Sequence, residues 1–240
     1  MSDETPTGVL VHGAFADASS WNGVVELLQA KGLKVTAPAN PLRGIAIDSA
    51  YIAGVLGQIP GPILAVGHSY GGAVLTNAAT NAENVLGLVY VAAFAPAEGE
   101  VLGGVTGGSK DSVLDTALVS LQYPAGDSGG TAVEFAIDPA KFHDAFAADL
   151  PAEQSAVLAA TQRPVAEAAF SEPSGPPAWK RLPSWAAVAS ADTAAGTDVI
   201  RSMAQRAGAT ITELEGSHVI MISQPQAVTD VILEALEVGS

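Results

Sequence analysis

Short apolar runs that suit β-strands alternate with helical patterns at both ends of this chain, and this alternation constrains its fold most. In the first part, the predicted strands are residues 8–11, 33–37, 62–66 and 85–93, and the predicted helices are residues 20–31, 46–58 and 72–79. The alternation resumes later, with strands at 184–190 and 210–214 and helices at 197–207 and 225–237. Runs with few polar interruptions are typical of strands covered on both faces. The sequence therefore predicts an α/β fold, with a mostly parallel six-stranded sheet flanked by helices.

The alternation breaks between the fourth and fifth predicted strands, where paired glycines and scattered prolines interrupt the pattern. This stretch is too long to be a plain connection. Helical patterns at 139–150 and 151–160 predict an inserted, largely helical cap over the carboxyl ends of the strands, where ligands bind in open α/β sheets. We expect residues 1–94 and 184–240 to form the core and residues 95–183 to form the cap. An insertion with no role in substrate binding is the alternative.

Residues Gly67–Gly71 read Gly-His-Ser-Tyr-Gly, which matches the G-x-S-x-G turn between a strand and a helix. The context fits, because an apolar run precedes the motif and a small-residue helix start follows it. Such a turn holds the serine in a strained conformation, and its glycines avoid collisions with neighbouring backbone. The motif predicts Ser69 as a nucleophile. An incidental turn is the alternative in a chain with 25 glycines.

A serine hydroxyl needs a base to take its proton, and the base needs an acid to orient it. Of the four histidines, His218 follows the last predicted strand and lies after Ser69 in chain order, as in the serine hydrolases of this architecture. We expect His218 to be the base, with a surface loop histidine as the alternative. Asp192 follows the strand that begins at Ser184 and is the favoured acid. Glu98, beyond the fourth strand, is its rival, and Asp192 as a mere helix cap is the other alternative.

An oxyanion hole needs two backbone N–H groups aimed at the developing negative charge. Tyr70, directly after the nucleophile, is expected to supply one of them. The loop after the first strand is expected to supply the other, from Ala14 or, as second choice, Phe15. An ordinary turn at His12-Gly13 is the alternative. This chemistry requires no metal and no cofactor, and the chain has no cysteine to act as nucleophile or thiolate ligand.

Three segments, Val11–Trp21, Gly67–Gly72 and Gly216–His218, together resemble α/β-hydrolase-fold proteins of the small esterase and hydroxynitrile-lyase-like branch. The resemblance covers nearly the whole chain. It implies Asp192 as the acid, because residues 189–192 stand where that family has a Gly-x-x-Asp segment.

The chain departs from the family pattern near the acid and beside two other site residues. Ala189 replaces the glycine of the Gly-x-x-Asp segment, and Gly196 replaces the proline usual four residues past the acid. The plant-type lyases of this branch carry a threonine directly after the histidine that ends the first strand, where this chain has Gly13 after His12. They also carry a lysine directly after the catalytic histidine, where this chain has Val219. Haloalkane dehalogenases and epoxide hydrolases on this fold need a carboxylate nucleophile, whose place Ser69 takes.

The sequence therefore predicts a serine hydrolase that cleaves carboxylic esters through an acyl-enzyme on Ser69. A hydroxynitrile-lyase-type enzyme and a catalytically inactive ligand receptor on the same fold are the alternatives. Small, neutral, mostly apolar esters are the expected substrates. The aromatic residues expected to line their pocket are Phe94, Tyr123, Phe142, Phe146 and Trp179, with Leu121, Phe135 and Phe170 as further apolar candidates.

The formal net charge is −15, from 25 acidic and 10 basic residues, and it repels nucleic acid and anionic membrane surfaces. The first residues, 1–6, are acidic and lack the pattern of a signal peptide, and no apolar run approaches 18 residues. We expect a cytoplasmic monomer or homodimer that binds neither nucleic acid nor membrane.

Overall fold

The computed structural model describes residues 5–126 and 129–238, so the outermost ends of the expected core and two residues of the expected cap lie outside the described residues. The main sheet has six strands, in the spatial order β2 (Val35–Thr36), β1 (Thr7–Val11), β3 (Ile63–His68), β4 (Val85–Val91), β8 (Ser184–Ala189) and β9 (Thr210–Leu214). Each neighbouring pair is parallel. The prediction of a parallel six-stranded sheet is confirmed.

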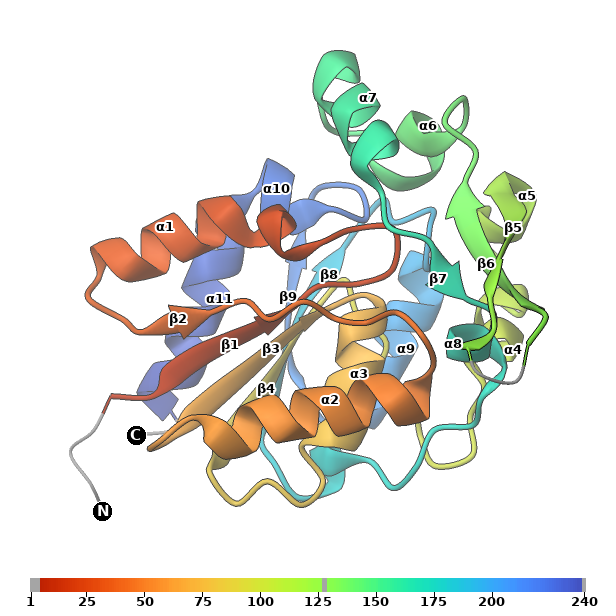
Figure 1. Ribbon diagram of the computed structural model, residues 1–240. Coiled ribbons are helices and arrows are strands. Elements are labelled where there is room, and N and C mark those ends of the chain that lie inside the picture. Colours follow the sequence, from red (N-terminus) through yellow and green to blue (C-terminus); the bar gives the residue numbers. More distant parts are fainter. Residues whose placement is uncertain (1–4, 127–128, 239–240) are drawn as a thin grey trace.

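Helices cover both faces of this sheet (Figure 1). On one face lie α1 (Asn22–Ala30) and α11 (Pro225–Val238), together with the short helices η1 (Ala18–Trp21) and α10 (Ile220–Ser223). On the other face lie α2 (Ile45–Gln58), α3 (Tyr70–Ala78) and α9 (Thr197–Arg206). Every residue of β3 is buried, which explains why its sequence reads as an uninterrupted apolar run before Gly67.

The order in which strands are added to the sheet reverses at β1: β2 lies on one side of it, and β3 and all later strands of the main sheet lie on the other. Parallel sheets bind ligands at the carboxyl ends of their strands, near such a switch point. Three of the predicted site residues follow strands at this edge, since Ser69 follows β3, Asp192 follows β8 and His218 follows β9. The topology therefore gathers residues that are far apart in the sequence.

Residues 95–183, called the inserted segment below, connect β4 to β8. Its helices are α4 (Leu102–Gly107), α5 (Leu114–Ala117), α6 (Phe142–Phe146), α7 (Ala152–Thr161), α8 (Ala168–Ser171) and η3 (Ala178–Lys180). It also forms an antiparallel sheet that the sequence analysis did not predict, with the strands β5 (Leu118–Pro124), β6 (Thr131–Ile137) and β7 (Val165–Ala166). The helix predicted at 151–160 matches α7, whereas the one predicted at 139–150 is only the short α6.

The inserted segment docks on the loop before α2. The backbone N–H of Ala166 in β7 donates to the carbonyl of Leu42 at 2.9 Å. Arg43 forms an ion pair with Glu134 of β6 at 2.6 Å, and its guanidinium lies 4.4 Å from the ring centre of Tyr123 in β5. These contacts fix the small sheet against the core.

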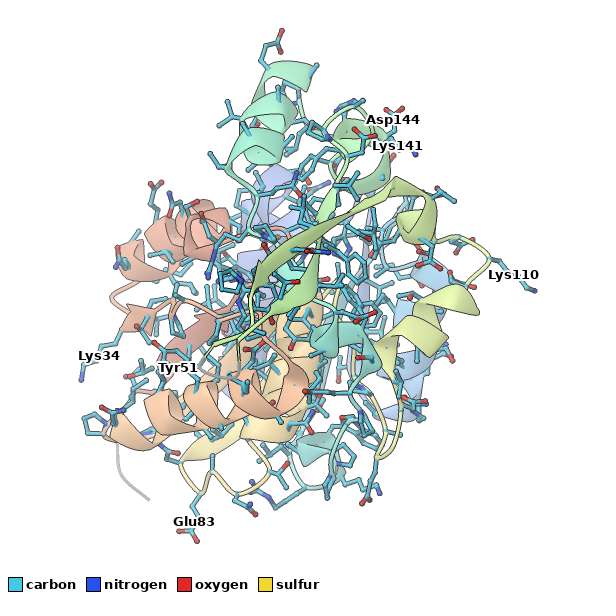
Figure 2. All side chains as sticks on the ribbon, turned by 45° about the vertical axis from the view of Figure 1, so that its right-hand side comes forward. Lys34, Tyr51, Glu83, Lys110, Lys141 and Asp144 are labelled. Atoms are coloured by element: carbon cyan, nitrogen blue, oxygen red, sulfur yellow. The ribbon has the colours of Figure 1, made fainter. Side chains whose placement is uncertain are left out.

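The charged side chains of Lys34, Glu83 and Lys110 are exposed at the periphery of the molecule (Figure 2). Within residues 5–126 and 129–238, no helix is both long enough and apolar enough to cross a membrane.

Candidate active site

Ser69 lies in the turn between β3 and α3 with φ 51° and ψ −123°, a conformation that L-residues rarely adopt. The turn is held by the Ser69 carbonyl, which accepts hydrogen bonds from the N–H groups of Gly72 at 3.0 Å and Phe94 at 3.2 Å. A Cβ on Gly67 or Gly71 would collide with neighbouring backbone atoms. The local sequence thus forms the strained strand-to-helix turn that the motif predicts.

His218 and Asp192 form a buried pair. Nδ1 of His218 lies 2.8 Å from Oδ2 of Asp192, and the two side chains are 2% and 1% exposed. A carboxylate only accepts hydrogen bonds, so the proton of the neutral imidazole lies on Nδ1. Nε2 is then unprotonated and is the nitrogen able to accept a proton.

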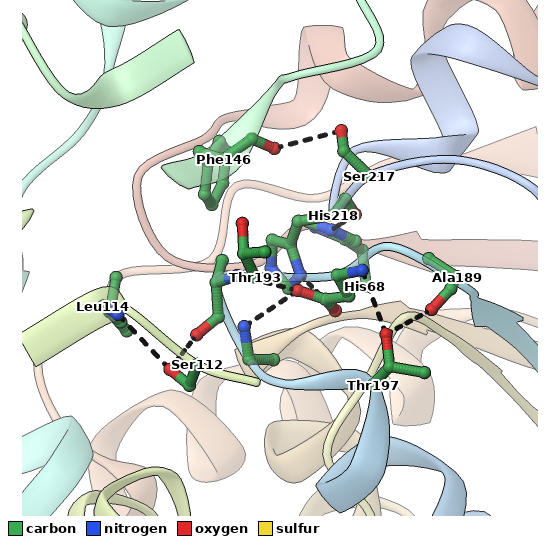
Figure 3. Close-up of polar contacts among 12 residues, drawn as sticks. His68, Ser112, Leu114, Phe146, Ala189, Thr193, Thr197, Ser217 and His218 are labelled. Carbon is green, nitrogen blue, oxygen red and sulfur yellow. Dashed lines mark hydrogen bonds and ion pairs between the residues drawn. The ribbon is translucent and has the colours of Figure 1, made fainter. Parts of the chain in front are cut away.

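The rest of the Asp192 carboxylate is held by backbone groups. Its Oδ1 accepts hydrogen bonds from the N–H groups of Ala194 at 3.0 Å and Ala195 at 2.9 Å. Thr197 accepts from the Asp192 N–H at 3.0 Å and donates to the Ala189 carbonyl at 2.8 Å (Figure 3). The loop that carries the acid is therefore tied to the end of its own strand.

The departure at Gly196 has a backbone reason. This residue has φ 92°, whereas a proline ring fixes φ near −65°. The rival acid, Glu98, is exposed in the loop after β4, and the carboxylate bonded to His218 is that of Asp192.

Ser69 and His218 line the same small cavity. Backbone positions expected to form an oxyanion hole, Ala14, Phe15 and Tyr70, line it as well. Its remaining lining residues are apolar: Phe94, Leu114, Phe146, Phe170, Ala194 and Ala195. Ser69 therefore lies in a mainly apolar surrounding, where electrostatic interactions are stronger than in water.

Gly13 allows the loop after β1 to approach the nucleophile. A Cβ at this position would lie 2.7 Å from Cβ of Ser69, so no side chain fits there. Phe15 has φ 60°, a second strained residue beside the cavity. His12 fixes the loop, because its Nε2 accepts from the Asn40 N–H at 2.9 Å and the Asn40 side chain donates to its carbonyl at 3.1 Å.

Tyr70 is anchored by a buried carboxylate. Its hydroxyl donates to Asp48 at 2.8 Å, and Asp48 also accepts from the backbone N–H of Arg43 at 3.0 Å. Burial raises the pKa of Asp48 above its ordinary value, although these hydrogen bonds oppose the shift. Tyr70, which follows Ser69, is thus fastened to the loop on which the inserted segment docks.

The aromatic residues predicted to bind substrate divide into three groups. Phe94 and Phe146 line the cavity of Ser69, and Phe142 joins Phe146 in a neighbouring cavity between the loop after β1 and helix α7. Tyr123 and Trp179 line neither cavity, because Tyr123 lies against Arg43 and the indole of Trp179 donates to the Pro96 carbonyl at 3.1 Å.

Three lining residues of the Ser69 cavity were outside the predicted set: Leu114, Ala194 and Ala195. The two alanines follow Asp192 directly, and their closeness to the acid in sequence could have identified them. For Leu114, which lies in the inserted segment, no comparable sequence signal exists.

The inserted segment also touches the loops that carry Asp192 and His218. The Val113 N–H donates to the Thr193 carbonyl at 2.8 Å, beside Asp192. Ser217, beside His218, donates to the Asp149 carboxylate, and the ring centre of Phe146 lies 4.9 Å from that of His218. Both loops are therefore positioned from the inserted segment as well as from the core.

Among the described residues, no group of three or more His, Asp or Glu side chains is arranged to hold a metal ion.

The model of the alpha/beta hydrolase family matches residues 9–231 of the chain. The chain belongs to the alpha/beta hydrolase family. The matched range includes Ser69, Asp192 and His218 and both halves of the main sheet. Comparison with curated protein sequences finds no match.

Solved structures agree with this alpha/beta hydrolase fold along the whole chain. Polyneuridine aldehyde esterase is 21% identical with a TM-score of 0.79, covering 96% of this chain and 99% of its own. A methylesterase from Arabidopsis is 20% identical with a TM-score of 0.79, covering 97% and 99%. Tomato methylketone synthase I, solved with 2-tridecanone, is 21% identical with a TM-score of 0.79, covering 99% and 100%. At such identities, the similarity establishes the fold.

Proposed function

We propose that this alpha/beta hydrolase cleaves small, neutral, mostly apolar carboxylic esters, with Ser69 as nucleophile, His218 as base and Asp192 as acid. One observation carries the proposal: Ser69 lies in a strained turn and shares a cavity with His218, and Nδ1 of His218 forms a hydrogen bond with the buried carboxylate of Asp192. Two structural neighbours are named as esterases, which supports the same reaction class.

The proposed reaction begins when Nε2 of His218 takes the proton of the Ser69 hydroxyl as its oxygen attacks the ester carbonyl carbon. The tetrahedral intermediate collapses, the alcohol leaves with the proton from His218, and the acyl group stays on Ser69. Water then attacks this acyl-enzyme with His218 again as base, which releases the acid and restores the serine. Asp192 keeps the imidazole in the required tautomer and stabilises the imidazolium.

Backbone N–H groups of Tyr70 and of Ala14 or Phe15 are proposed to stabilise the oxyanion of each intermediate. The placement of Ala14 and Phe15 depends on Gly13, which lets their loop lie against Ser69. The same glycine argues against cyanohydrin cleavage, because the threonine of the plant-type lyases has no room at this position. The inserted segment serves as the cap in this proposal, because it contributes Leu114, Phe146 and Phe170 to the cavity.

The expected substrates are neutral because the cavity is apolar around Ser69 and the chain carries a net charge of −15. An anionic ester would lose hydration in the cavity and would be repelled during approach. A strong preference for dicarboxylate monoesters over neutral esters of equal size would contradict this part of the proposal.

The test is the turnover of p-nitrophenyl acetate by the native protein and by Ser69→Ala. We expect the substitution to lower kcat by about 10³-fold or more, because the nucleophile is lost, while the protein stays folded. A serine-directed phosphonate should label the native protein at Ser69 alone. The matched control is Ser49→Ala, since Ser49 is buried in α2 and its hydroxyl donates to the Val74 carbonyl.

Two outcomes would redirect the assignment. Retention of more than a tenth of the activity in Ser69→Ala would remove this serine from its role. A native protein that is folded, binds apolar esters and turns over none of them would instead be a ligand receptor on this fold.

A further inference from the structure

His68, the residue before the nucleophile, is buried beneath the catalytic pair and has no step in the reaction above. Its side chain has no exposure to solvent. Nε2 of His68 lies 3.0 Å from the backbone carbonyl oxygen of His218, and the two ring centres are 4.7 Å apart (Figure 3). This contact joins residues 150 positions apart in the sequence.

The chemistry of the contact fixes the proton on His68. A carbonyl oxygen only accepts, so Nε2 must carry the proton and donate it. Nδ1 of His68 is buried and has no hydrogen-bond partner among the described residues, which agrees with its being unprotonated. Burial, and then the charge that His218 can carry, hold the pKa of His68 well below its ordinary value, so the ring is neutral.

A neutral donor suits this position. During the proposed reaction His218 becomes an imidazolium, and a second positive ring 4.7 Å away would raise the energy of that state. The neutral His68 ring can therefore hold the base without opposing its protonation.

We infer that His68 is a positioning residue for the general base: its Nε2–H fixes the backbone of His218 from the core side. The Asp192 carboxylate fixes the same residue through its imidazole Nδ1. With both the backbone and the ring held, Nε2 of His218 stays directed to the cavity that contains Ser69. The inference rests on the proposed function, since it assigns His218 the role of base.

The variants that isolate the hydrogen bond are His68→Gln and His68→Met, which have nearly the same size. The Gln side chain places an amide N–H close to where Nε2 of histidine lies, whereas the Met side chain has no donor. Both variants lose the ring, so ring packing is equal between them and only the donor differs.

We expect His68→Met to lower kcat on p-nitrophenyl acetate by about ten- to a hundredfold, because small misplacements of a catalytic group have effects of this size. KM should change less than threefold, and His68→Gln should keep kcat within about fivefold of the native value. Equal losses in the two variants, or a His68→Met variant with native kcat, would overturn the inference.

A second readout needs no substrate and separates this inference from the proposed function. The proton between Nδ1 of His218 and Asp192 should give a far-downfield NMR signal, identified by its loss in Asp192→Asn. This signal should broaden or move in His68→Met and persist in His68→Gln. An unchanged signal in both variants contradicts the inference, even if the native protein hydrolyses no ester.

If His68→Met does not fold, His68→Asn replaces it, because the shorter Asn amide cannot reach the His218 carbonyl. Near-native activity and NMR signal in the Gln variant, with a loss of both in the Asn variant, would support the inference. Near-native activity and signal in both variants would overturn it.

Discussion

Asp192 is the residue whose environment explains its role most fully. Each of its two carboxylate oxygens has a defined partner: Oδ2 bonds His218, and Oδ1 accepts from two backbone N–H groups. Water contributes little, because the side chain is 1% exposed. In the proposed reaction, a carboxylate held in this way would orient the imidazole without rearrangement during turnover.

The first prediction concerns this acid. Asp192→Asn should leave a folded protein whose kcat falls by about 100-fold or more, because an amide favours the wrong tautomer of His218. Glu98→Gln is the control and should stay within about twofold, since Glu98 is exposed beyond β4. Initial rates on one activated ester measure both variants. A nearly normal Asp192→Asn variant beside an inactive Glu98→Gln variant would move the acid to Glu98.

Single residues were predictable from the sequence where a motif and a strand end coincide. Ser69 is of this kind, because it follows the buried apolar strand β3 within the G-x-S-x-G motif. His218 follows β9, whose residues are exposed or partly buried, and its place after Ser69 in chain order is what indicated it. The pocket aromatics were less predictable, since their positions depend on how the inserted segment folds. Tyr123 shows the reason: the ring of an exposed strand lies against Arg43, whose partner in space no local pattern reveals.

At the scale of elements, the loop before α2 joins the inserted segment to the core. The Arg43 side chain contacts two strands of the small sheet, while its backbone N–H bonds Asp48. Burial lowers the pKa of the Arg43 guanidinium, but the hydrogen bond and negative charge of Glu134, together with Tyr123, outweigh this and raise the pKa above its usual value.

We predict that Arg43→Met loosens the contact between the small sheet and the loop before α2. The loop itself should keep its conformation, because the hydrogen bond from the backbone N–H of residue 43 to Asp48 remains. The free energy of unfolding should fall by about 1 kcal/mol, a small value because the pair is partly exposed and screened. Limited proteolysis should cut the β5–β6 connection faster than in the native protein. Arg201→Met is the matched control, since its exposed ion pair with Glu213 joins α9 to β9 and not to the small sheet. It should leave the cleavage rate of the β5–β6 connection unchanged.

The small sheet also had a signal in the sequence. Residues 118–124 and 131–137 contain alternating β-favouring residues, and Gly126, Gly129 and Gly130 between them all have positive φ. Glycines between two such runs indicate a hairpin. The observed helix α6 is shorter than the helix predicted at 139–150, because a turn at Asp138 precedes it. It ends at Phe146, and the next residue, Ala147, has left the helical conformation with φ −139°.

At the scale of the whole molecule, two buried histidines, His12 and His68, make stability depend on pH. Burial lowers the pKa of His12 to about 4, and His68 is lowered as well. The unfolded chain binds a proton on each near pH 6.5, whereas the folded chain does not. The stability contributed by these two histidines is therefore fully present above pH 6.5 and is lost as the pH drops from there through the folded pKa.

We predict that His12→Gln flattens this dependence between pH 6.5 and 4.5. The His12 contribution is about 3 kcal/mol in total, lost at about 1.4 kcal/mol per pH unit. A Gln side chain can still accept from the Asn40 N–H, so the fold should persist. Urea unfolding at several pH values, followed by tryptophan fluorescence, measures the slope. His143→Gln is the control, and parallel slopes for native and His12→Gln proteins would refute the prediction.

The order of strands in the main sheet has a consequence for synthesis on the ribosome. β4 lies between β3 and β8, but β8 follows it only after the inserted segment, about ninety residues later. At about 5–20 residues per second, the apolar edge of β4 waits about 5–20 s for its neighbour. During that interval the nascent chain carries Ser69 without Asp192 or His218. Nascent chains therefore present an edge that chaperones can bind, and the proposed triad can assemble only after His218 has been synthesised.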